Sequence, residues 1–335
     1  MAGTDVAVLG APNTELMRRT ARAVVHRALG LVGSLWILLT AGFLMIHLVP
    51  GDPVRAALGR NAAEELVQAR RAELGLNDPI LTQYVRYLWD VPRGRLGESI
   101  FTGQSVATTV RDQFGASLNL ALLAFALVVV VAVPLGVVAG ALTRGGRRRQ
   151  FELGFTTGSI VLATIPSFIL AQVLVYVFAV KLEWLPIAGA AGLSSYVLPV
   201  VALAVTPAAI LTRIVRVELL AVLDQDFIRT ARSKRLPVWW LYCREALPNA
   251  MTATLTMAGL ILTGLIAGTI LVENVFSWPG LGTSMVTSIR QKDYPMVQAI
   301  LIVYGFGVIV TNLVVDIILA AIDPRSALKR GTVEG

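Results

Sequence analysis

The sequence predicts an all-α, polytopic membrane protein with six transmembrane helices. Hydrophobic residues make up 56% of its 335 residues and charged residues only 15%, with a mean hydropathy of +0.71. Soluble globular proteins carry about 25% charged residues, so the chain has too few charges to cover a soluble surface. The apolar residues are gathered into six runs of roughly 20 residues, the length that a helix needs to cross the hydrocarbon layer.

The six predicted spans divide the chain into membrane and aqueous segments. The spans cover residues 28–49, 117–142, 153–180, 196–212, 251–272 and 297–322. Pro50 and Pro53 end the first helix where the chain leaves the lipid. Between and beyond the spans we expect a tail at 1–27, a helical cap at 50–116, a five-helix core at 117–322 with a long loop at 213–250, and a second tail at 323–335.

Residues that typically start or end helices predict the local structure of the cap. Asn61, with Glu64 three residues later, is typical of a helix start, and Gly75 of a helix end. Asp78-Pro79 begins a second predicted helix, and a third covers 106–114. The cap is either a folded connection or a docking surface.

The distribution of basic residues predicts the orientation of the chain. Both tails, the 143–152 loop and the 213–250 loop carry all of the chain's positive surplus, whereas acidic and basic residues balance in the other connections. Basic loops stay in the cytoplasm, so both termini are predicted to be cytoplasmic and the 50–116 cap external. The pI near 10.0 therefore reports topology and does not indicate nucleic acid.

The sequence offers no catalytic or metal-binding pattern. It has one cysteine and two histidines, so neither an internal disulfide nor a Cys/His zinc site is expected. It contains no Gly-Lys dipeptide, hence no P-loop, and no Gly-x-Ser-x-Gly or His-Glu-x-x-His motif. The residues therefore predict no catalytic site and no cofactor bound by this chain.

The 213–250 loop contains the clearest motif. A helix over 225–234, capped by Asp224, is stopped by Leu236-Pro237, and Pro237 can begin a second helix that runs through Trp239 to Ala246. The corner between the two helices carries Leu236, Val238, Trp239 and Trp240. These apolar side chains either bind a protein partner or lie on lipid headgroups.

Two stretches of this loop resemble the cytoplasmic signature of a transporter family. Asp226-Phe-Ile-Arg-Thr-Ala-Arg-Ser-Lys-Arg-Leu236 and Arg244-Glu-Ala-Leu-Pro-Asn-Ala250 resemble the loop of the permease subunits of binding-protein-dependent ABC importers, in the dipeptide, oligopeptide and nickel branch. The family's glycine falls on Arg235, where a left-handed backbone would cost an arginine about 1 kcal/mol. The resemblance assigns ATPase coupling to Asp226, Arg229, Thr230, Ala231, Arg235, Leu236, Pro237, Trp239, Glu245 and Pro248.

Further stretches resemble the same family in the same order along the chain. They are His47-Leu-Val-Pro-Gly-Asp-Pro53, Val275-Phe-Ser-Trp-Pro-Gly-Leu-Gly282 with Asp293-Tyr-Pro295, and Asn312 to Asp323-Pro-Arg325. The resemblance implies a type I ABC importer permease fold in the bacterial cytoplasmic (inner) membrane.

The resemblance also implies partners and a mechanism. ATP and Mg would be bound by two ATPase subunits or domains, and a second homologous permease chain and an external substrate-binding protein would complete the complex. Alternating access would move di- or oligopeptides through the bilayer, with nickel, glutathione or oligosaccharides as other cargoes. A self-contained secondary transporter or channel is the alternative class.

Other polar and aromatic residues give weaker predictions. Asn312 and Asp316 in the last span mark either the translocation path or an interfacial, structural position. Thr164 to Ser167 predicts a kink at Pro166. Two small-residue pairs, Gly136/Gly140 and Gly154/Gly158, could allow close helix packing, and Tyr196, Trp184 and Trp278 are expected in an outer aromatic belt.

Overall fold

The computed structural model describes residues 29–45, 52–59, 61–146 and 148–322. Most of these residues are helical, with no strand among them beyond an isolated bridge between Glu98 and Ser105. The chain divides into two units, Met1–Pro50 and Gly51–Gly335. The first unit contributes the apolar helix Leu29–Met45, which lies within the predicted first span; residues 46–51, with most of the His47 to Pro53 stretch, are outside the described part.

The second unit begins with the cap. Its helices are α2 (Pro53–Leu58), α3 (Glu64–Glu73) and α4 (Ile80–Asp90), followed by a 3₁₀ turn at Val91–Arg93. The predicted Asn61 cap is wrong, because α3 starts at Glu64 with Ala63 in the cap position. Gly75 follows α3 with a φ of 65°, as predicted for a residue that ends a helix.

The cap also has an internal ion pair that closes its first turn. Arg71 of α3 donates to the Asp52 carboxylate at 2.5 Å, and the same carboxylate caps α2 by accepting from the Val54 N–H at 3.0 Å. Burial opposes ionisation of Asp52, but the Arg71 guanidinium and the backbone N–H groups of Arg55 and Val54 together outweigh it, so the pKa of this carboxyl lies below its usual range. The first turn of the cap is therefore fixed at neutral pH by a charged Asp52.

Four helices of the second unit's described residues are long and apolar enough to cross a membrane, or five spans if a bent pair is counted as one. The four are α5 (Val106–Thr143), α8 (Leu193–Leu223), α11 (Leu247–Val275) and α13 (Tyr294–Ile322). The third cap helix predicted over 106–114 is instead the first part of α5, because Gly115 does not interrupt the helix. Four of the six predicted spans thus coincide with a helix long enough to cross, whereas the third is a broken pair and Leu29–Met45 is shorter than the usual spanning length of about 20 residues.

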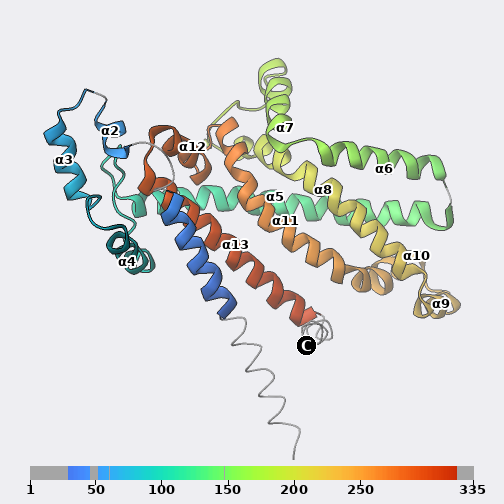
Figure 1. The fold of residues 1–335 in the computed structure, drawn as a ribbon. Helices are drawn as coiled ribbons and strands as arrows, with labels where there is room; N and C mark the ends of the chain where they lie inside the picture. Colours follow the sequence, from blue (N-terminus) through green and yellow to red (C-terminus); the bar gives the residue numbers. More distant parts are fainter. Residues whose placement is uncertain (1–28, 46–51, 60, 147, 323–335) are drawn as a thin grey trace, which may run out of the picture. The chain divides into compact units, whose positions relative to one another are not determined.

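The bent pair is the third predicted span. It consists of α6 (Arg149–Thr164), α7 (Ser167–Leu174) and a π-helical stretch at Val175–Lys181, with a 93° bend between the two parts. Pro166 cannot donate a backbone hydrogen bond and pushes Ile165 out of the helical region, to ψ 117°. The predicted kink is confirmed and is sharp enough to send α7 away from the direction of α6 (Figure 1).

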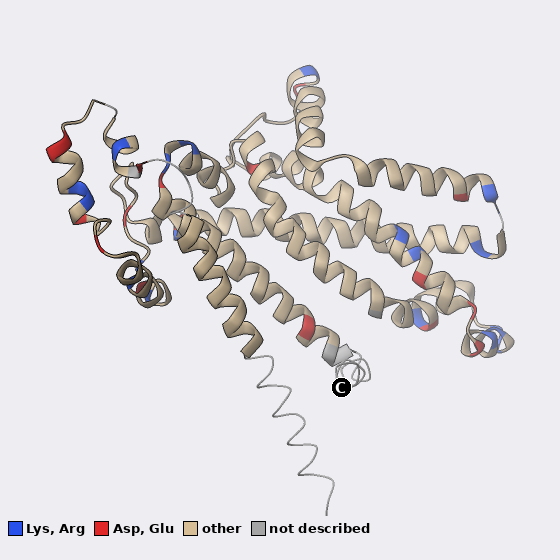
Figure 2. Ribbon diagram, viewed as in Figure 1, with Lys and Arg blue, Asp and Glu red and all other residues tan. Residues whose placement is uncertain are grey.

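The two ends of the bundle differ in charge. The cap and α12 (Leu281–Gln291) lie at one end, called here the α12 end; the α5–α6 turn, α9 (Asp226–Ser233) and α10 (Val238–Trp240) lie at the other, the α9 end (Figure 1). Both ends carry both signs (Figure 2), but lysines and arginines outnumber acidic residues at the α9 end, whereas the two signs balance in the cap. The 143–152 and 213–250 loops therefore share one end, as the charge pattern predicts.

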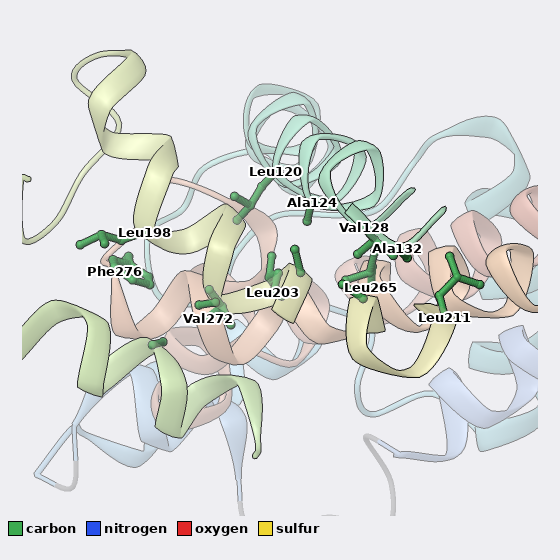
Figure 3. Packing of buried hydrophobic residues seen from close by; sticks show 14 of the residues in the cluster. Leu120, Ala124, Val128, Ala132, Leu198, Leu203, Leu211, Leu265, Val272 and Phe276 are labelled. Carbon is green, nitrogen blue, oxygen red and sulfur yellow. The ribbon is translucent and has the colours of Figure 1, made fainter. Parts of the chain in front are cut away.

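Helix α8 forms the centre of the core. Buried side chains of α5, α8 and α11 interdigitate there, among them Leu120, Val128, Leu203, Leu211 and Leu265 (Figure 3). A second cluster at the α9 end joins the last turns of α8 to α9 and to the start of α11. The core thus connects the 213–250 loop directly to the longest helices of the bundle.

One of the two glycine pairs has the predicted packing role. A Cβ on Gly136 would lie 2.6 Å from Val215 Cβ and 2.9 Å from the Thr212 carbonyl oxygen, so α5 and α8 approach closely at this glycine. A Cβ on Gly158 would meet no atom of the described chain within 4 Å. The pair at 136 and 140 is a helix contact, and the pair at 154 and 158 is not one within the described residues.

We expect Gly136→Val to destabilise the bundle by about 1–3 kcal/mol, because the backbone of α8 would have to move away from the new side chain. The thermal unfolding midpoint in detergent measures the effect. Gly158→Val is the matched control and should shift the midpoint much less. Equal midpoints for the two variants would contradict the close α5–α8 contact.

Candidate functional site

Helix α9 holds the first half of the signature-like stretch against the end of α8. Its buried face is Ile228 and Ala231, which pack in the cluster with Leu219, Val222 and Leu223. The opposite face exposes Asp226, Arg229 and Thr230. Arg229 and Asp226 form a solvent-exposed ion pair at 3.3 Å, which contributes little stability. The charged face of α9 is therefore available to another molecule.

The corner after α9 is built through a left-handed residue. Arg235 has a φ of 53°, and its N–H donates to the Arg232 carbonyl at 2.9 Å. Sequence reasoning left open whether an arginine can occupy this position, and the structure shows that the strain is tolerated. Asp224, predicted to cap α9, lies instead just beyond the last residue of α8, and Gln225 takes the cap position.

Replacing Arg235 with glycine should stabilise the protein by about 1 kcal/mol, because glycine adopts the left-handed region without a Cβ clash. The midpoint of thermal unfolding checks this. Arg229→Gly is the control: it places glycine inside α9 and should destabilise by about 1 kcal/mol. A lower midpoint for Arg235→Gly would mean that the arginine side chain itself supports the corner.

The corner presents an apolar surface. Pro237 occupies the cap position of α10, and Val238 and Trp239 are 71% and 64% exposed. Leu236 is half-buried and packs against the cluster beneath it. The corner is thus anchored on one side by Leu236 and open on the other through Val238 and Trp239.

The second half of the signature-like stretch continues without a break into α11. Residues Leu241–Ala246 form a π-helix, in which Arg244 lies over the Trp240 ring at 4.5 Å. Glu245 belongs to this segment, and its carbonyl accepts from Asn249 at 2.7 Å. Pro248 follows in the first turn of α11. Force applied at the corner would therefore pass directly into α11.

Arginines connect the loop to the rest of the α9 end, a feature that sequence reasoning missed. Arg144, in the α5–α6 turn, donates to the last carbonyl of α8, at Leu223, over 3.0 Å. Arg216 of α8 donates to Thr143 Oγ1 at 3.0 Å and forms a partly buried ion pair with Glu152 of α6. Helices α5, α6 and α8 are thus tied together where the loop leaves the bundle, and only the number of arginines hinted at it.

The α12 end contains a buried carboxylate that organises the 275–282 stretch. Glu273 accepts from the Gly282 N–H at 2.7 Å, and Ser117 Oγ of α5 accepts from the Leu281 N–H at 2.9 Å. Trp278 is fully buried, and its indole N–H donates to the Ala116 carbonyl at 3.3 Å. Its predicted place in an aromatic belt is wrong, because α5 supplies a partner for its polar edge.

A second buried carboxylate fixes the loop before α5. Asp293, between α12 and α13, accepts hydrogen bonds from the Ser99 hydroxyl and from the Ile100 N–H, the latter at 3.2 Å. Ser99 Oγ in turn accepts from the Thr102 N–H at 3.0 Å. The end of the cap and α12 therefore form one connected surface at the α12 end.

The two residues predicted for the translocation path lie on α13. Asn312 Oδ1 accepts from Thr263 Oγ1 of α11 at 2.9 Å, a link between the two helices. Asp316 lies about one turn further on and is half-buried. Their role in a path stays a prediction. Among the residues that the structure describes, no group of three or more His, Cys, Asp or Glu side chains could hold a metal ion.

Comparison with known proteins identifies the family. Residues 132–327 match the family described as binding-protein-dependent transport system inner membrane component, and residues 20–121 match the N-terminal family of such membrane components. The glutathione transport system permease protein GsiC of Escherichia coli K12 is 36% identical over 306 residues, which are 91% of this chain and 99% of that protein. GsiC of Shigella dysenteriae serotype 1 and of Shigella boydii serotype 4 give the same values. The chain therefore belongs to the binding-protein-dependent transport system inner membrane components, as a permease subunit of a bacterial ABC importer.

Proposed function

We propose that this permease moves small peptides across the cytoplasmic membrane by alternating access, with glutathione, itself a tripeptide, as the first cargo to test. The relatives named above are glutathione permeases, and they align along nearly the whole chain. Dipeptides and longer oligopeptides belong to the same chemical class, because each offers amide groups and a free carboxylate.

The exposed corner is the observation that carries the mechanism. Val238 and Trp239 offer apolar surface to water at the arginine-rich end of the bundle, beside the charged face of α9. An apolar surface of this kind, bordered by charges, fits a cleft on another protein. We assign that partner as one of two ATPase subunits or domains, which bind ATP and Mg; this chain binds neither.

The packing of the corner against α8 and its continuity with α11 support the transmission of force from the corner into these two helices. Closure of the ATPase pair would push α9 and the π-helical segment, and the push would reach α8 through Leu223 and α11 through continuous helix. Asp226, Arg229, Thr230, Ala231, Arg235, Leu236, Pro237, Trp239, Glu245 and Pro248 form the coupling site in this proposal.

The position of the ATPase at the corner also assigns the two sides of the membrane and the other partners. The α9 end and both termini face the cytoplasm, and the α12 end faces outward, where the connected surface of the cap and α12 meets the binding protein. Five or six spans enclose too little space for a peptide, so a second homologous permease chain faces this one across the path. The lipid bilayer surrounds the pair.

Reconstitution tests the proposal. The full complex of both permeases and the ATPase subunits in proteoliposomes, supplied with the binding protein, should take up labelled glutathione or a labelled di- or pentapeptide only with ATP. Liposomes that hold this chain alone should take up none of them. Uptake by this chain alone, driven by an ion gradient, would contradict the proposal and favour a self-contained transporter.

A further inference from the structure

A cavity of 340 Å³ opens at the bend of the third span. The break between α6 and α7 forms one wall, from Ala163 to Ser167, and α8 forms a second wall with Leu203, Thr206 and Pro207. Helix α11 closes the floor, with Gly264 and Gly268 among the lining residues. The cavity therefore lies where three spans meet, in the range of volumes that small ligands occupy.

Two prolines give this cavity a polar backbone. Pro166 removes the N–H that would pair with the Leu162 carbonyl, and Pro207 removes the N–H that would pair with the Leu203 carbonyl. Thr206 replaces part of the hydrogen bonding lost at Pro166, since its hydroxyl lies 2.8 Å from the Ile165 carbonyl oxygen and 3.4 Å from the Leu162 carbonyl oxygen. The walls thus combine apolar side chains with the hydroxyl groups of Thr164, Ser167 and Thr206 and with backbone carbonyl oxygens at the two prolines.

Such a wall does not suit contact with lipid. Irregular backbone at membrane depth persists only where protein covers it or where it lines a water-filled cavity, because each unpaired polar group in hydrocarbon costs several kcal/mol. Helix α11 lines the floor with Ile261 and Leu265, but it leaves open space at its two glycines. A Cβ on Gly264 would meet no atom of the described residues within 4 Å, and one on Gly268 would meet only Leu203 at 3.8 Å.

We propose that this cavity, between Pro166 of the third span and Pro207 of the fourth, is a water-filled section of the translocation path. Its carbonyl and hydroxyl oxygens accept hydrogen bonds from the amide N–H groups of a passing peptide. The inference rests on the proposed function and adds the location of the path. It places the path on the bend and on α8, whereas Asn312 lies in a contact between α11 and α13.

Cysteine accessibility tests this location. Cys243 is the chain's single cysteine, so Cys243→Ser gives a parent in which Ser167→Cys, Thr206→Cys and Gly264→Cys can be placed one at a time. Val130→Cys is the matched control, because Val130 is a 69% exposed apolar residue of α5 that does not line this cavity. Asn312→Cys and Asp316→Cys probe the alternative path along α13.

The assembled complex in inside-out vesicles is treated with a membrane-impermeant, charged thiosulfonate, and labelling is resolved by chain on a gel. We expect the three cavity cysteines to react roughly tenfold or more faster than Val130→Cys, because a thiolate forms only in contact with water. Trapping the ATPase with vanadate should slow that reaction, because the path closes to the inner side. In the same vesicles, the Cys243→Ser parent is assayed for ATP-driven release of labelled peptide from the lumen, which is loaded with the binding protein.

Two outcomes separate this inference from the function on which it rests. If the parent transports peptide while the cavity cysteines react no faster than Val130→Cys in either state, the path lies elsewhere, and labelling at 312 and 316 would place it along α13. If the parent complex transports no peptide, the proposed function fails, and the inference fails with it.

Discussion

The double variant Leu236→Asp/Trp239→Asp should lose ATP-driven uptake and the stimulation of ATP hydrolysis by the loaded binding protein. Trp239 is 64% exposed, and a tryptophan of this kind, once buried in a partner's cleft, contributes about 2 kcal/mol or more to binding. An aspartate in the same cleft adds a desolvation cost, so the affinity for the ATPase should fall by roughly a hundredfold. Co-purification of the ATPase subunits, uptake and stimulated hydrolysis are the measurements.

Two further variants separate coupling from folding. Leu236 packs against the cluster beneath α9, so its replacement can also lower stability, whereas Trp239→Asp alone changes an exposed side chain. Trp184→Asp is the matched control, because Trp184 is 70% exposed in the connection before α8 and outside the corner. If Trp239→Asp retained stimulated ATP hydrolysis and bound ATPase at the level of Trp184→Asp, the corner would not be the coupling site.

The sequence predicts this corner because its determinants are local. Pro237 begins the second helix of the corner, the apolar residues stand next to one another, and the basic residues around them identify the end of the bundle. The bend at Pro166 was predictable for the same reason, since a proline acts on the turn that contains it. The size of the bend was not predictable, because it depends on how α7 packs against α8 and α11.

Contacts between distant residues could not be predicted. Trp278 finds its hydrogen-bond acceptor on Ala116, 162 residues earlier in the chain, and from the sequence alone it resembled an interfacial tryptophan beside a Pro-Gly turn. The sequence identifies Arg144 and Arg216 only as inside-facing charges, although each binds a specific partner on a neighbouring helix. A charge count identifies the side of the membrane but cannot identify the partner of a single side chain.

Gly282→Val should release α12 from the bundle. A Cβ on Gly282 would lie 2.5 Å from Ile270 Cα and 2.9 Å from Glu273 Oε2, so the new side chain would strike the backbone of α11 as well as the carboxylate. The Gly282 N–H would lose its 2.7 Å bond to Glu273, and a fully buried carboxylate would lose a donor. Overpacking and the lost hydrogen bond should each cost about 1–3 kcal/mol. The thermal midpoint in detergent reports the global effect.

Local release of α12 has its own readout, because trypsin can cut after the exposed Arg290 near the end of this helix. Gly282→Val should be cut there much faster than the parent, whereas Gly115→Val, a glycine of α5 with no described atom within 4 Å of a new Cβ, should not. Glu273→Gln keeps an oxygen that can accept from the Gly282 N–H, so its rate of cleavage by trypsin should lie between the rates of these two variants. If Glu273→Ala resisted trypsin as well as the parent, the buried carboxylate would not hold α12, and the contact of Leu281 with Ser117 would have to hold it instead.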